Sequence, residues 1–118
     1  MAEKLTIEEA RKVAAWCKKQ LGLPHWTIKF YFEKVPKGID IGPDDLGSST
    51  FSADQRRAKI WVSLDRSSNR RECISTICHE YLHVFYADKG IEAEEGMSHN
   101  AAYQQENLYT KAYLAGVK

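Results

Sequence analysis

The feature that most constrains the fold of this chain is a pair of histidines four residues apart, within the run His79-Glu80-Tyr81-Leu82-His83. On an α-helix, residues at this spacing lie on one face about one turn apart, so their imidazoles can converge on a single metal ion. The pattern HExxH therefore predicts a helix with a metal-binding face.

The residues around the motif predict the same helix. Apolar side chains recur at helical spacing and form one face, while His79 and His83 project from the other; they are Ile74, Ile77, Cys78, Tyr81, Leu82 and Phe85. Asn69, with Glu72 three residues later, is a cap signal, and Gly90 is a stop signal. We expect a half-buried helix that ends at about Asp88.

The rest of the chain predicts a single α+β domain over residues 1–118. Thr6 and Glu9 form a capping box for a first helix that ends at Gly22 and Pro24. Period-two patterns predict strands at 26–33, 47–53 and 58–64, the last two joined by a polar turn. Ser98 is the expected cap of a final helix to about Ala115. We expect a three-stranded, mainly antiparallel sheet.

The strand at 47–53 differs from the other two. Its run Ser48-Ser49-Thr50 has little to bury on one face. Free backbone groups on such a strand could pair with an extended peptide, or the segment is an ordinary polar edge strand. The pattern leaves both interpretations open.

Composition narrows the class of partner. Lys and Arg total 17 against 16 Asp and Glu, so the formal net charge is +1 and no overall field favours nucleic acid or an anionic membrane. No apolar run is long enough to span a bilayer, and the N-terminus has no secretion signal. Cys17, Cys73 and Cys78 are odd in number and lie in apolar patterns, which is typical of reduced, buried thiols. We expect a cytoplasmic protein without a membrane partner.

Imidazole pairs of this kind suit zinc, and Glu80, about 100° around the helix, suits the role of a base that takes a proton from water. A catalytic zinc usually has three protein ligands and one open position. Two residues of the final helix are candidates for the third ligand, Glu106 and His99, which lie seven residues apart on one face. Tyr103, Tyr109 and Tyr113 lie around Glu106, and spacing assigns none of them an oxyanion-binding role.

The order of elements, with HExxH and then a helix carrying Glu106-Asn107-Leu108-Tyr109-Thr110-Lys111, resembles the minigluzincins and similar phage-encoded metallopeptidases. The resemblance implies a small zincin-like fold in which Glu106 is the third zinc ligand. Locally, Gly96-Met97-Ser98-His99-Asn100-Ala101-Ala102-Tyr103 is similar to the histidine segment of SprT-like proteases, which implies His99 instead. The metzincin spacing is absent, because Tyr86 and Lys89 stand where its glycine and third histidine would be.

We therefore expect a zinc metallopeptidase that acts on a peptide or protein substrate, with His79, His83 and Glu106 on Zn²⁺ and Glu80 as general base. The alternatives are a DNA-associated, SprT-like protease with His99 on the metal, and a non-catalytic module. In that module a structural zinc would be closed by four ligands, His79, His83, Glu106 and His99.

Overall fold

The computed structural model describes residues 4–90 and 97–116, and side chains for all of these except 97–104. Six elements follow one another along the chain: α1 (Ile7–Gln20), β1 (Thr27–Phe32), β2 (Gly47–Ser52), β3 (Arg57–Val62), α2 (Arg70–Asp88) and α3 (Met97–Leu114). Three helices and a three-stranded sheet make this a small α+β domain, as the sequence predicted.

The caps that the sequence predicted for the first two helices are present. The Thr6 side chain accepts a hydrogen bond from the backbone N–H of Glu9 at 3.1 Å, and Asn69 accepts one from Glu72 at 2.9 Å. Gly22 and Gly90 follow the two helices with φ of 66° and 73°, a conformation that glycine adopts without steric cost. Helix α3 begins at Met97, so Ser98 lies inside it and is not its cap.

The sheet is mixed, whereas we had expected it to be mainly antiparallel. The strand order is β1-β3-β2, with β1 parallel to β3 and β2 antiparallel to β3. The reason is the long connection 33–46, which carries the chain from one edge of the sheet to the other and leaves the central position to β3. As the central strand, β3 buries the run Ile60-Trp61-Val62.

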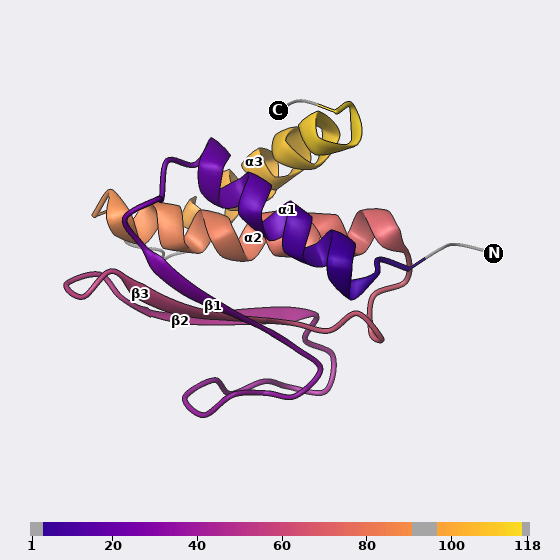
Figure 1. The fold of residues 1–118 in the computed structure, drawn as a ribbon, viewed down its shortest axis with the longest axis horizontal. Coiled ribbons are helices and arrows are strands. Elements are labelled where there is room, and N and C mark those ends of the chain that lie inside the picture. The colour runs from indigo at the N-terminus through magenta and orange to yellow at the C-terminus, as the bar shows by residue number, and fades with distance from the viewer. Residues whose placement is uncertain (1–3, 91–96, 117–118) are drawn as a thin grey trace.

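Helix α2 lies at the centre of the molecule. One side of it packs on β2 and β3, and the other side packs on α1 and α3, as Figure 1 shows. Its buried residues therefore occupy more than one face, and they include Ile74, Ile77, Leu82 and Val84 together with the charged Glu80. No helix among the described residues is long and apolar enough to cross a membrane.

Candidate functional site

The two histidines of the motif meet on the surface of α2. His79 and His83 place their Nε2 atoms 3.0 Å apart, with ring centroids 4.6 Å apart and ring planes at 85°. Both side chains are only partly exposed. The helical spacing thus brings the two imidazoles together, as the sequence predicted.

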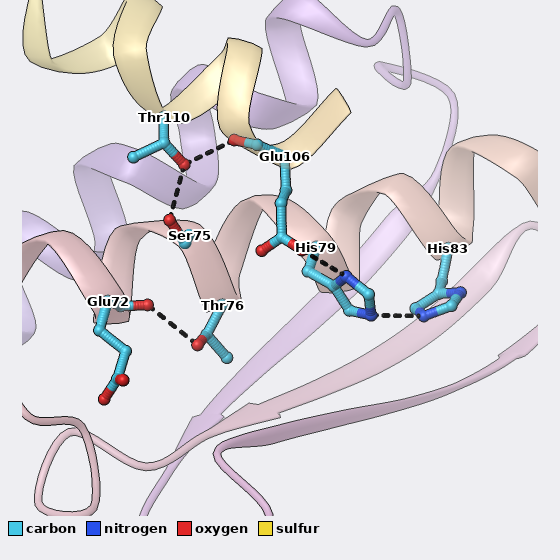
Figure 2. A network of polar contacts seen from close by, with 7 residues as sticks. All are labelled: Glu72, Ser75, Thr76, His79, His83, Glu106 and Thr110. Carbon is cyan, nitrogen blue, oxygen red and sulfur yellow. Dashed lines mark hydrogen bonds and ion pairs between the residues drawn. The ribbon is translucent and has the colours of Figure 1, made fainter. Parts of the chain in front are cut away.

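Glu106 reaches the same pair from α3. Its Oε1 lies 3.3 Å from Nδ1 of His79, and the side chains of His79 and Glu106 are 13% and 12% exposed. Figure 2 shows His79 between the Glu106 carboxylate and His83. Burial lowers the pKa of His79, but the Glu106 and Glu80 carboxylates outweigh it, so the pKa is raised overall.

A hydroxyl contact one turn further along fixes α3 against α2. The Oγ of Ser75 on α2 lies 3.0 Å from Oγ1 of Thr110 on α3, and Thr110 also donates to the backbone carbonyl of Glu106 at 2.6 Å. Thr110 is fully buried. Figure 2 shows this contact directly beside Glu106, so it sets the position from which Glu106 reaches His79.

The side chain of Glu80 lies against β2, where its Cγ is close to Gly47. It is 6% exposed, and burial raises its pKa to about 7, against the opposing effects of His79 and of a hydrogen bond with Ser49. A carboxyl group with this pKa can both accept and release a proton near neutral pH. This property matches the general-base role expected from the sequence.

Gly47 lets β2 approach α2 closely, and sequence reasoning missed it. A Cβ atom at this position would lie 2.7 Å from Cγ2 of Thr76 and 3.3 Å from Cγ of Glu80. Only glycine fits without displacing its neighbours. A glycine at the start of an otherwise polar strand was the available signal.

Between β2, α2 and α3 lies a cleft of about 300 Å³, which we call the site cleft. Its lining residues come from all three elements and from the residue before β2; they are Leu46, Gly47, Glu72, Ser75, Thr76, His79, Glu80 and Glu106. The base and two of the metal ligands expected from the sequence therefore share one cleft.

The donor types suit zinc, which binds imidazole nitrogen and carboxylate oxygen. Two nitrogens on a tetrahedral zinc lie about 3.4 Å apart, close to the 3.0 Å between the two Nε2 atoms here. The side chains of Glu106, His79 and His83 lie in a row, because Glu106 contacts Nδ1 of His79 and His83 contacts its Nε2. In the described part of the chain, no three donor groups surround a single point.

The remaining candidates on α3 divide into two groups. The side chains of His99 and Tyr103 lie outside the described residues. Tyr109 and Tyr113 pack edge-on against Trp16 of α1, with centroids 6.0 and 5.4 Å from it, and neither lines the site cleft. These two tyrosines help to pack α3 against α1.

Comparisons with protein-family models, with curated proteins and with solved structures gave no match. The resemblance to minigluzincins therefore stays a prediction that depends on the motif and the order of elements.

Proposed function

We propose that this protein is a zinc-dependent metallopeptidase in which His79, His83 and Glu106 hold the metal and Glu80 is the general base. The observation that carries the proposal is the contact between Glu106 and His79, two residues 27 positions apart in the chain. Helix geometry alone brings His79 and His83 together, but only the packing of α3 on α2 adds a carboxylate to them.

Zinc bound by these residues would polarise a peptide carbonyl and make water easier to deprotonate. The Glu80 carboxylate accepts a proton from the attacking water and then delivers it to the leaving amine. Burial against β2 keeps this carboxyl out of bulk solvent and, in the chain without metal, raises its pKa to about 7.

The substrate in this proposal is an extended polypeptide beside β2. The strand order makes β2 an edge of the sheet, and Gly47 at its start lines the site cleft. Backbone pairing with an edge strand holds a peptide without regard to its sequence. Among the two interpretations of this polar strand, its position next to Glu80 favours peptide binding.

We also propose a cytoplasmic location. The three cysteines are free and buried, and Sγ of Cys17 lies 3.5 Å from Sγ of Cys78 without a bond. Buried free thiols are typical of proteins in a reducing compartment.

The test compares the natural chain with Glu80→Gln, after both are loaded with zinc and freed of excess metal. We expect both to retain about one zinc per chain, and Glu80→Gln to lose hydrolysis of a denatured protein substrate by about 100-fold or more. Glu8→Gln, an exposed carboxylate on α1, is the matched control and should keep full activity. Bound zinc without any turnover would support the structural-zinc module instead, and turnover independent of Glu80 would reject the mechanism.

A further inference from the structure

A second hollow, of about 540 Å³, lies at one end of the sheet and away from the site cleft. Three cationic side chains line it, Lys29 from β1 and Arg57 and Lys59 from β3, together with Thr50 and Ser52 from β2. Lys29 pairs with Lys59 in the sheet register, so both point to one face, while their neighbours Phe30 and Ile60 point to the face that packs on α2. We call this the cationic hollow.

The connection 33–46 covers the neighbouring part of the same face, up to the edge of the cationic hollow. Trp61 is buried beneath this connection and donates from Nε1 to the carbonyl of Glu33 at 3.0 Å. Lys59 marks the border, because its Nζ donates to the carbonyl of Lys37 at 3.1 Å. In Figure 1 the connection lies below one end of the sheet and leaves the other end uncovered.

Among the residues whose side chains the structure describes, 4–90 and 105–116, no carboxylate lines the hollow and none forms an ion pair with Lys29, Arg57 or Lys59. Asp54, in the turn between β2 and β3, is the acid nearest along the chain to Arg57 and Lys59, and it pairs with neither. The whole chain carries a formal charge of only +1, so this concentration of positive charge is local and favours an anionic ligand.

Strand β2 connects the two hollows. Gly47, its first residue, lines the site cleft, and Thr50 to Ser52 at its other end line the cationic hollow. Three to five residues of strand span about 10–17 Å. The two hollows open on opposite faces of the sheet, since Lys29 and Lys59 point away from α2 while the site cleft lies between β2 and α2. Side chains of a paired strand alternate between the faces, so a polypeptide along the edge of β2 with one bond beside Glu80 would direct a side chain three to five residues from that bond toward the cationic hollow.

We propose that the cationic hollow is a substrate subsite that selects polypeptides with Asp or Glu three to five residues from the cleaved bond. This inference rests on the proposed peptidase function. Charge complementarity supplies the selection, and the β2 edge supplies the connection to the site. Nucleic acid fits less well, because it is bound along extended basic grooves, and here three cations from β1 and β3 form one compact cluster.

The test uses the charge reversal Lys29→Glu/Lys59→Glu, with Lys12→Glu/Lys19→Glu on exposed positions of α1 as the matched control. Fluorescence anisotropy on a Glu80→Gln background measures binding of two ten-residue peptides that differ only in Glu or Lys at the selected positions. We expect the charge reversal to weaken binding of the Glu peptide about tenfold and to leave binding of the Lys peptide unchanged. The effect on the Glu peptide should shrink at high salt. The control should change neither.

A kinetic measurement separates this inference from the function on which it rests. In the active chain, the reversal should raise KM for the Glu peptide about tenfold and leave kcat unchanged. If no variant hydrolyses peptides, the peptidase proposal fails, yet the binding measurement still decides whether the hollow holds acidic peptide. Equal affinity for both peptides, no measurable binding of the Glu peptide, or tighter binding of a twelve-nucleotide single strand that the reversal abolishes would each overturn the subsite.

Discussion

At the scale of single residues, Gly47 sets how closely β2 lies against the helix that carries the motif. The substitution Gly47→Ala would bring a methyl group within 2.7 Å of Thr76 and 3.3 Å of the Trp61 carbonyl oxygen. We expect a loss of about 1–3 kcal/mol in the free energy of unfolding, because the strand or the helix must move. Urea denaturation measures this loss.

Gly42→Ala is the matched control, since the nearest atom to its added Cβ would be 3.7 Å away, an ordinary contact. Equal stability of the two variants would show that β2 and α2 do not need the close approach seen here. If Gly47→Ala loses activity under conditions in which it is still fully folded, the added Cβ has displaced Glu80, which it would contact.

Glu106 and His99 differ in what their removal should do to metal binding. We expect Glu106→Ala to weaken zinc binding by about 100-fold or more, because it removes a ligand. His99→Ala should bind zinc within about threefold of the natural chain, because His99 is not a ligand in the proposed site. Competition with a chromophoric chelator measures both affinities, and the reverse order would support the SprT-like ligand set.

The residue-scale outcome shows what spacing can and cannot predict. The meeting of His79 with His83 follows from one turn of helix, so local sequence is sufficient to predict it. The contact of Glu106 with His79 needed the resemblance to a known order of elements, since His99 was an equal candidate by spacing. No sequence pattern marked Glu33 as a structural residue. Its carboxylate nevertheless accepts hydrogen bonds from the backbone N–H groups of Leu64 and Asp65 and from the hydroxyl of Ser63.

At the scale of elements, the register of α3 on α2 decides whether a carboxylate reaches the histidines. The Ser75–Thr110 contact is a part-buried polar link one helical turn from Glu106. Thr110→Val keeps the shape of the side chain but leaves the Ser75 hydroxyl without this partner, at a cost of about 1–3 kcal/mol. We expect zinc affinity to fall by about tenfold as Glu106 loses its fixed position.

Thr110→Ser restores the hydroxyl and should recover most of the zinc affinity. In Ser75→Ala/Thr110→Val both polar partners are gone, so its stability should exceed that of Thr110→Val alone. If Thr110→Val and Thr110→Ser bind zinc equally well, the contact has no part in positioning Glu106.

Elements whose signals are local were predicted well from sequence, and their pairing was not. The caps at Thr6 and Asn69 and the stops at Gly22 and Gly90 act within a few residues, so helix bounds follow from them. The parallel pairing of β1 with β3 depends on the path of the connection 33–46, which no strand pattern encodes. That pairing also places Lys29 beside Lys59, so the cationic hollow could not be predicted from the separate strands.

At the scale of the whole molecule, the three helices meet at Glu9. Arg70 at the start of α2 donates to both of its carboxylate oxygens, through Nε at 2.8 Å and through Nη2, and Tyr113 of α3 donates to it at 3.3 Å. The hydrogen bond with Arg70 is the main reason that the pKa of Glu9 is lowered from its ordinary 4.5. The fold therefore favours the charged carboxylate.

A lowered pKa gives stability that is complete above the ordinary pKa and lost as pH falls through the lower, folded value. We expect Glu9→Gln to reduce the free energy of unfolding by about 1 kcal/mol at pH 7, a modest figure because the pair is partly exposed. The difference from the natural chain should shrink as the pH falls below the ordinary pKa of 4.5 and should vanish only below the lowered pKa of the folded state. Thermal unfolding of the metal-free proteins across this range measures it, and a difference that persists at low pH would assign the effect to packing.

The measurement that tests the central claim most directly is the crystal structure of the zinc-loaded chain, with the metal located by anomalous scattering. The account predicts one zinc bound by the imidazoles of His79 and His83 and by the carboxylate of Glu106, with a remaining position open to solvent beside Glu80. A zinc bound by His99 while Glu106 stays on Nδ1 of His79, or one closed by four protein ligands, would contradict it.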